Sequence, residues 1–247
     1  MKNFFSFCFI VLFIGICSTS YANDMSCEQD YTKAIYQIVN TQQKTQTQLI
    51  LLRTTNKVAH HYPATEITES WELNQVKTIK PTRYFDHYKR AIEYQPTELV
   101  HGKIEKDWSY RYQLVSDDFL KKAKLIAQQY KGCELEESLQ YKSADLSYRI
   151  SYLPQKRLIS KFEVSTLDGN IIETWTLTDS THEQETVQAF FAAKDDFQST
   201  DFADIGDDHT DPFLTKMVTL GFIEASSSGF YHADDKGNVS ALGQHQH

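Results

Sequence analysis

The spacing of hydrophobic residues changes several times along this chain. Between Ser26 and Gln43 they recur at intervals of three and four, which predicts a helix. The chain then passes through short runs of β-branched and aromatic residues, separated by polar or proline positions. These runs predict strands at Leu49–Leu52, Val58–Tyr62, Thr68–Leu73, Val76–Phe85 and Ala91–Tyr94.

The middle of the chain shows two further patterns. Apolar and polar residues alternate over Trp108–Val115, with aromatic residues on one face, and this predicts another strand. A helical stripe then runs over Asp117–Tyr130, with Ser116 or Asp117 placed to cap its start.

Strands are expected again in the second half, at 146–152, 158–166 and 171–178. Asp168-Gly169-Asn170 forms a good hairpin turn between the last two. The pattern is helical at Glu183–Lys194 and again after Asp211, where Pro212 occupies the first turn.

Residues 1–22 have the composition of a secretory signal peptide. Lys2 gives a short positive region, an apolar run extends to Ile16, and Ser20-Tyr21-Ala22 supplies small residues for cleavage. The run is shorter than the roughly 20 residues of a permanent membrane helix. No later segment is apolar enough to cross a membrane. We therefore expect a mature chain that begins at Asn23 and is periplasmic or secreted.

Two of the four cysteines, Cys8 and Cys17, lie in the predicted signal peptide. A lipid on Cys17 is an alternative, which the bulky Ile16 before it disfavours. Cys27 and Cys133 remain, and they form no CxxC pair. In an oxidising compartment such a pair predicts a structural disulfide.

The net charge of -8 and a pI of 5.6 argue against nucleic-acid binding, because no basic cluster offsets them. Aspartates crowd the start of the segment 195–247, which we expect to form an acidic, histidine-containing extension of a β-rich domain at 23–194. Closely spaced carboxylates suit Ca²⁺ or another divalent cation. The candidate ligands are Asp204, Asp207, Asp208 and Asp211. The alternative is a set of turn and capping residues on a solvated face.

Aromatic residues make up 13% of the chain and concentrate in the predicted strands. Two interpretations stay open: these rings fill the core of a sheet, or they line a concave surface for an apolar ligand. The candidates for the second are Trp71, Tyr84, Trp108, Tyr110, Tyr112 and Trp175.

Catalytic motifs are not evident in the sequence, which has no HExxH, no GxSxG and no phosphate-binding glycine loop. Four glutamates of the predicted strands could supply an acid and a base, although strand carboxylates usually face water: Glu66, Glu69, Glu72 and Glu93. An enzyme is therefore not the favoured prediction.

The order of the predicted elements resembles that of periplasmic lipoprotein carriers of the LolA/LolB type, over about residues 27–191. An opening helix and a strand meander precede the helix at 117–130. Next come strands with Tyr152-Leu153-Pro154 and Leu167-Asp168-Gly169, then Thr176-Leu177-Thr178-Asp179 leading to Phe190-Phe191. The resemblance implies an α+β fold with a curved, half-barrel-like antiparallel sheet and covering helices. It also implies binding of acyl chains or another apolar ligand without chemistry, and it assigns no functional residue.

The favoured prediction is an exported, non-catalytic carrier of an apolar small molecule or a lipidated partner, without a cofactor. One alternative is an envelope interaction or assembly factor whose acidic C-terminal segment binds a partner or a divalent cation. The third is a hydrolase with unrecognised carboxylates.

Overall fold

The computed structural model describes residues 30–96, 98, 100, 103–131, 134–206, 211–219, 231–233 and 239–241. The strands in these residues are β1 (Thr32–Asn40), β2 (Thr45–Arg53), β3 (Lys57–Tyr62), β4 (Ile67–Leu73), β5 (Ile79–Phe85), β6 (Arg90–Glu93), β7 (Lys124–Lys131), β8 (Glu134–Lys142), β9 (Leu146–Leu153), β10 (Leu158–Thr166), β11 (Ile171–Thr181), β12 (Gln198–Asp201), β13 (Tyr231–Ala233) and β14 (Val239–Ala241). The helices are η1 (Asp86–Tyr88), α1 (Trp108–Gln113), α2 (Asp117–Lys122), α3 (Gln184–Asp195), η2 (Phe202–Gly206) and α4 (Pro212–Thr219).

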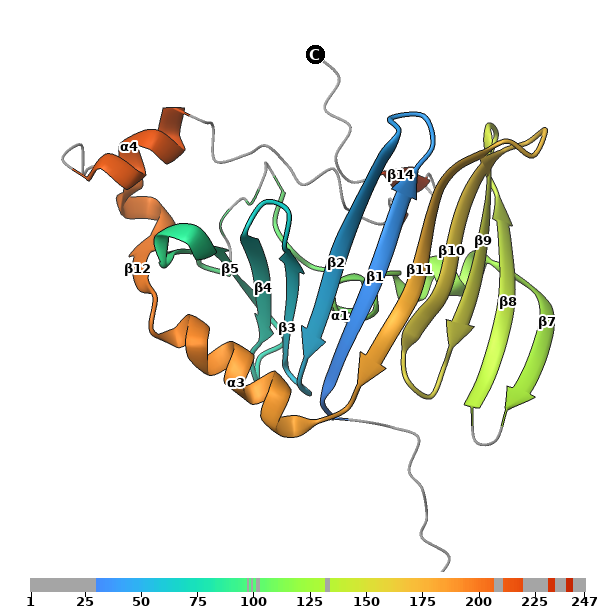
Figure 1. Ribbon diagram of the computed structural model, residues 1–247, viewed down its shortest axis with the longest axis horizontal. Coiled ribbons are helices and arrows are strands. Elements are labelled where there is room, and N and C mark those ends of the chain that lie inside the picture. Colours follow the sequence, from blue (N-terminus) through green and yellow to red (C-terminus); the bar gives the residue numbers. More distant parts are fainter. Residues whose placement is uncertain are drawn as a thin grey trace, which may run out of the picture.

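Twelve of the described strands form one open sheet, in the order β12-β6-β5-β4-β3-β2-β1-β11-β10-β9-β8-β7. All neighbours are antiparallel except β12 and β6, which run parallel. Figure 1 shows this sheet as one continuous curved surface with β7 at one end and β12 at the other. The α+β fold with a curved antiparallel sheet, predicted from the sequence, is confirmed.

The two faces of the sheet are covered by different helices. On β1, buried Ala34, Tyr36 and Ile38 alternate with less buried residues and belong to the same apolar cluster as residues of α1 and α2. We call this the inner face and its opposite the outer face. On the outer face, Val187 and Phe191 of α3 pack against β2 and β3. Figure 1 shows α3 and α1 on opposite sides of the sheet.

The chain after α3 continues the sheet. β12 pairs with β6 from Gln198 to Asp201, and α4 follows. Phe213 and Leu214 of α4 pack against Phe85 and Ile92 at this end of the sheet. β13 and β14 pair only with each other among the described strands.

The predicted helix at 26–43 is wrong where the structure describes it, because Thr32–Asn40 is the central strand β1. Ile35, Ile38 and Val39 satisfy a helical spacing, but in the strand they lie on both faces, with Ile38 buried and Val39 exposed. The β-branched residues and the buried alternation of Ala34 and Tyr36 fit a strand between two partners, and the sheet decides the outcome.

The strand predicted at Trp108–Val115 is also wrong, since Trp108–Gln113 forms α1. The Asp107 side chain accepts a hydrogen bond from the Tyr110 amide and caps the helix start, and Leu114 ends it with a φ of 66°. The helix predicted at Asp117–Tyr130 is correct only over α2, because β7 begins at Lys124.

Other elements agree with the sequence pattern. The strands at 49–52, 58–62, 68–73, 146–152, 158–166 and 171–178 lie within or across β2, β3, β4, β9, β10 and β11, and the helix at 183–194 is α3. Gly169 adopts a φ of 96° in the expected hairpin turn. The predicted signal peptide at 1–22 lies outside the described residues.

Candidate functional site

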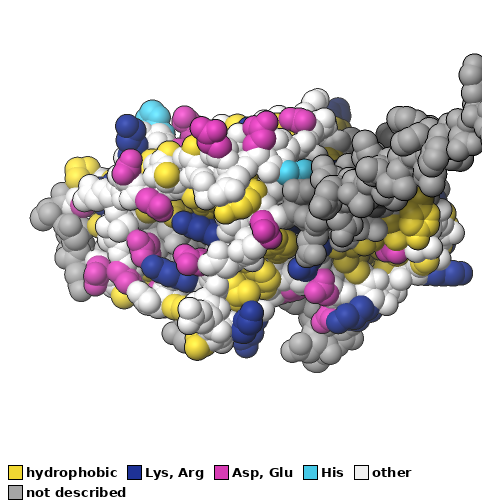
Figure 2. Space-filling view, turned by 90° about the horizontal axis from the view of Figure 1, so that it is seen from below, with side chains coloured by type: hydrophobic (Ala, Val, Ile, Leu, Met, Phe, Trp, Pro, Cys, Tyr) yellow, Lys and Arg dark blue, Asp and Glu magenta, His cyan; other side chains and the backbone are white. Residues whose placement is uncertain are grey.

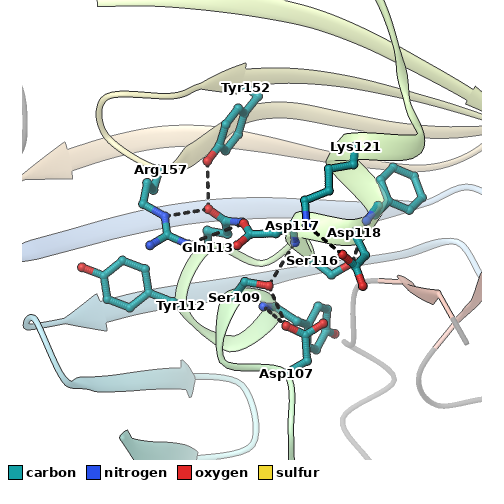
Figure 3. Close-up of polar contacts among 12 residues, drawn as sticks. Asp107, Ser109, Tyr112, Gln113, Ser116, Asp117, Asp118, Lys121, Tyr152 and Arg157 are labelled. Atoms are coloured by element: carbon teal, nitrogen blue, oxygen red, sulfur yellow. Dashed lines mark hydrogen bonds and ion pairs between the residues drawn. The ribbon is translucent and has the colours of Figure 1, made fainter. Parts of the chain in front are cut away.

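A short helical segment crosses the inner face of the sheet. We call residues 107–123, which contain α1 and α2, the strap. The Ser116 side chain accepts a hydrogen bond from the Phe119 amide and caps α2, as the sequence predicts. The Asp117 amide donates to the Ser109 hydroxyl at 3.0 Å, which ties the two helices together (Figure 3).

The strap is seated on the sheet through the C-terminal end of α1. The last carbonyls of a helix have no partner within the helix. His60 of β3 donates from Nε2 to the Arg111 carbonyl at 2.8 Å, and Arg53 of β2 donates from Nη1 to the Tyr112 carbonyl at 2.8 Å. Two polar side chains of the inner face therefore supply the hydrogen-bond donors that the last carbonyls of α1 lack.

Gln113 joins the strap to the hairpin between β9 and β10. Its side chain is fully buried. Its Oε1 accepts from the Tyr152 hydroxyl at 2.8 Å and from Arg157 Nε at 3.0 Å, while its Nε2 donates to Asp117 at 2.6 Å. Figure 3 shows these groups converging on Gln113 from the strap and the strands. The bonds with Tyr152 and Arg157 therefore attach α1 to the β9–β10 hairpin, and the bond with Asp117 connects α1 to α2.

At the α2 end, the strap contacts the sheet through aromatic rings. The Phe119 ring lies 5.4 Å from that of Tyr141 on β8 and 5.8 Å from that of Tyr148 on β9. At the other end, the Arg111 guanidinium lies 4.1 Å from the Trp71 ring centroid on β4. Seven strand spacings of about 4.8 Å separate β4 from β8, yet only eight residues separate Arg111 from Phe119. The sheet therefore curves around the strap.

Burial controls the charge state under α1. Burial lowers the pKa of His60 to about 3, with a further contribution from the Arg111 cation, so this imidazole is neutral at pH 7. The neighbouring Glu105 carboxylate, 2.6 Å from Arg111, raises the pKa of that guanidinium against the effect of burial. His60 is thus a neutral donor beside a paired cation.

Five of the six aromatic residues predicted to bind a ligand meet on the inner face. Trp71, Tyr110, Tyr112 and Trp175 are buried, and Trp108 packs partly buried against the same cluster. The sixth, Tyr84, alternates to the outer face and contacts Phe197, with ring centroids 5.9 Å apart. The five inner rings lie in the strap or in the sheet beneath it, so a ligand meets them only where the strap moves away. Ligand contact by these residues stays a prediction.

Two of the four predicted cation ligands, Asp204 and Asp211, lie in the described part of the chain. Asp211 accepts hydrogen bonds from the Phe213 and Leu214 amides, which caps α4, and lies 2.7 Å from Arg90. Asp204 is exposed in η2. No group of three or more metal-binding side chains occurs among the described residues. Asp207, Asp208, Cys27 and Cys133 lie outside them.

The four glutamates considered as an acid and a base are spread over β4, its preceding turn and β6. Glu69 forms an ion pair with Arg83, and Glu93 lies 2.5 Å from Lys80. Glu66 lies 3.5 Å from His87, and Glu72 is exposed. Two of the four carboxylates therefore have a lysine or arginine partner.

Arg53, His60 and Gln113, which seat the strap, are not among the site residues predicted from the sequence. A signal for the first two exists. Arg53 ends the run Leu49–Leu52 and His60 lies inside Val58–Tyr62, so each is a polar residue in a strand that otherwise predicts burial. Gln113 gives no such signal, because the alternating pattern around it predicts a strand.

Two grooves open away from the strap. One, of about 380 Å³, lies along β8–β10 and is lined by the apolar residues Ile126, Leu139 and Ile150 together with charged residues such as Arg149, Lys161 and Glu163. The other, of about 400 Å³, lies beside α3 and includes Lys57 and Phe191. Figure 2 shows Asp and Glu interspersed with Lys and Arg on the face seen from below. Mixed charge of this kind is typical of a solvated surface.

No family model and no curated protein matches this chain. Solved structures do match. A conserved protein from Thermus thermophilus is 8% identical with a TM-score of 0.42, over 71% of this chain and 92% of that one. The MucA/MucB complex of Pseudomonas aeruginosa matches at 8% identity and a TM-score of 0.37, over 66% of this chain and 56% of that one.

A domain described as an outer membrane lipoprotein-sorting protein, from Vibrio parahaemolyticus, matches at 10% identity and a TM-score of 0.30, over 69% of this chain and 93% of that one. The lipoprotein-carrier type expected from the order of elements is therefore represented among these structures. The likeness concerns the fold alone. Within the described residues, no helix is both long and apolar enough to cross a bilayer.

Proposed function

We propose that this protein is an exported, non-catalytic carrier that binds an apolar ligand, or the acyl chains of a lipidated partner, between the inner face of the sheet and the strap. One observation carries the proposal. A strap of two six-residue helices covers the aromatic inner face of an open sheet and is seated at one end by a few polar side chains.

The energetics favour a strap that can lift. Isolated helices of this length are unstable in water, so α1 and α2 depend on their contacts with the sheet. Hydrogen bonds from Arg53, His60 and Gln113 contribute about 1 kcal/mol each to the closed position, and buried strap residues such as Phe119 add their apolar contacts with the sheet. An apolar chain of about ten methylenes that takes the place of these contacts gains roughly 8 kcal/mol on burial, which offsets much of the loss.

The sheet is suited to receive such a chain. Its end strands β7 and β12 lie at opposite ends of the strand order, so the sheet is not closed into a barrel. Lifting the strap exposes Trp71, Trp175 and Phe162, which lie on the inner face of three separate strands. The predicted signal peptide at 1–22 would export the chain. An exported location fits a carrier of lipids or lipidated proteins.

Binding is tested with N-phenyl-1-naphthylamine, a neutral apolar dye whose emission rises on burial. The full mature chain should take up the dye saturably, and native mass spectrometry after gentle purification should show lipid adducts. All three tryptophans of the sequence belong to or pack against the inner cluster, so their emission should change with binding.

A matched pair of variants on β11 locates the site. Leu177 faces the inner cluster, whereas its neighbour Thr176 is exposed on the outer face. Leu177→Phe should weaken dye uptake several-fold by narrowing the inner space, while Thr176→Phe should leave it unchanged. Absence of saturable dye uptake and of lipid adducts would overturn the proposal, and equal effects of the two variants would place the ligand elsewhere.

A further inference from the structure

Arg53 is an unusual residue at this site because its charge is buried under the strap. The residue is 2% exposed. Its Nη1 donates to the carbonyls of Tyr112 and Arg157 at 2.8 Å each, and its Nη2 donates to the carbonyl of Lys156. Its Nε is buried without a hydrogen-bond partner. All acceptors of this cation are therefore neutral carbonyls, and one donor is unused.

The other largely buried arginines have a different environment. Arg83 pairs with Glu69, Arg90 lies 2.7 Å from Asp211, and Arg111 lies 2.6 Å from Glu105. These contacts supply a carboxylate to each guanidinium.

For Arg53, no carboxylate lies within ion-pair distance among the described residues; its charged neighbour is a second cation, Arg157. Both guanidiniums approach the ring of Tyr112, at 4.3 and 5.0 Å from its centroid. A buried charge without a counter-ion is costly. Moreover, the Tyr112 ring and carbonyl belong to the strap. Lifting the strap removes both from Arg53 and leaves the guanidinium facing the ligand space.

We infer that Arg53 binds the acidic headgroup of the carried amphiphile, a carboxylate or a phosphate, so that the ligand is an acyl or alkyl chain with an anionic end. The inference rests on the proposed carrier function and specifies its ligand class. The free Nε beside the Nη groups provides the forked donor set that carboxylate and phosphate accept in bidentate fashion. The headgroup would replace the Tyr112 carbonyl and supply the missing negative charge, while the chain lies against the aromatic rings.

The test compares headgroups on one chain length. Dodecanoate, dodecyl phosphate and methyl dodecanoate each displace N-phenyl-1-naphthylamine from the full mature chain, below their micelle concentrations. At least one anionic ligand should displace the dye at concentrations about 10-fold lower than the neutral ester. The stronger of the two anions identifies the preferred headgroup.

In Arg53→Met, the concentrations at which the anion and the ester displace the dye should differ by no more than about two-fold, because methionine keeps most of the side-chain bulk but carries no charge. That variant also loses a bond to the strap, so a control with the same defect is needed. His60→Leu loses the bond to the Arg111 carbonyl and keeps Arg53. It should shift the affinities for ester and anion together and retain the preference.

A measurement on the unmodified protein covers the case in which Arg53→Met does not fold. The ¹³C carboxyl shift of bound [1-¹³C]dodecanoate should show an ionised headgroup down to about pH 5, because an adjacent cation lowers a carboxyl pKa. Equal displacement by the ester and both anions, or a bound carboxyl that is neutral at pH 6, would overturn the inference while leaving the carrier function standing. Failure of every ligand and of the dye itself would instead remove the carrier function.

Discussion

The neutral imidazole of His60 gives a quantitative test of how the strap is seated. Burial, with a further contribution from the Arg111 cation, lowers the pKa of His60 to about 3. In the unfolded chain the pKa of histidine is about 6.5. Between these values the unfolded chain binds a proton that the folded chain excludes. Stability therefore falls as the pH falls from 6.5 towards 3.

The magnitude follows from the pH chosen. At pH 4.5 the unfolded imidazole is charged and the folded imidazole is neutral, which corresponds to about 2.7 kcal/mol at about 1.4 kcal/mol per pH unit. At pH 7 the same linkage is worth only about 0.2 kcal/mol. His60 alone should therefore remove about 2.5 kcal/mol of unfolding free energy between pH 7 and pH 4.5.

Equilibrium urea denaturation at the two pH values measures this loss. His60→Gln keeps an amide donor for the Arg111 carbonyl but does not titrate, so its loss should be smaller than that of the wild type by about 2.5 kcal/mol. Gln184→Leu changes an exposed side chain of α3 that does not titrate and should lose as much as the wild type. Equal losses in the wild type and in His60→Gln would refute a strap seated on a buried neutral imidazole.

Three further changes probe other contacts. Gln113→Leu should lower the free energy of unfolding by about 2–3 kcal/mol, because the buried Tyr152 hydroxyl loses its acceptor. In the same urea titration, Gln184→Leu, at an exposed position of α3, should change the free energy of unfolding by less than about 0.5 kcal/mol. Phe119→Ala should lower the free energy of unfolding in urea by about 3–5 kcal/mol, whereas Leu125→Ala, at a half-exposed position, should lower it by about 1 kcal/mol or less. Similar losses in the two variants would contradict the packing of Phe119 against the sheet. Asp211→Ala should speed amide exchange in α4 by a factor equivalent to about 1 kcal/mol more than Asp211→Asn, which keeps the cap; equal exchange rates would show that the cap contributes nothing.

Local pattern predicts the strands of this protein well wherever one face is buried and the other wetted. The meander from β2 to β5 and the hairpins of β9 to β11 follow from alternating residues and turn chemistry, including the positive φ of Gly169. The caps at Ser116 and Asp211 are also readable, because each hydroxyl or carboxylate precedes a helical segment.

The strap could not be predicted in the same way. Trp108, Tyr110 and Tyr112 alternate as strand residues do, and α1 is only six residues long, so its local preference is weak. Its helical form depends on His60 and Arg53, which are distant in sequence and donate hydrogen bonds to the last carbonyls of the helix. The tertiary partner decides the secondary structure there, and the candidate site lies under the part of the chain that sequence pattern describes least well.

The position of the ligand is tested most directly by photolabelling. A dodecyl chain with a terminal diazirine, irradiated with the full mature chain, labels whatever side chains surround it, and peptide mass spectrometry locates the label. We expect saturable labelling of the strap and of β1, β9, β10 and β11. Unlabelled ligand should suppress this labelling, and Leu177→Phe should weaken it while Thr176→Phe should not. Labelling that does not saturate, or that is confined to α3 and the outer face, would contradict a ligand held between the strap and the sheet.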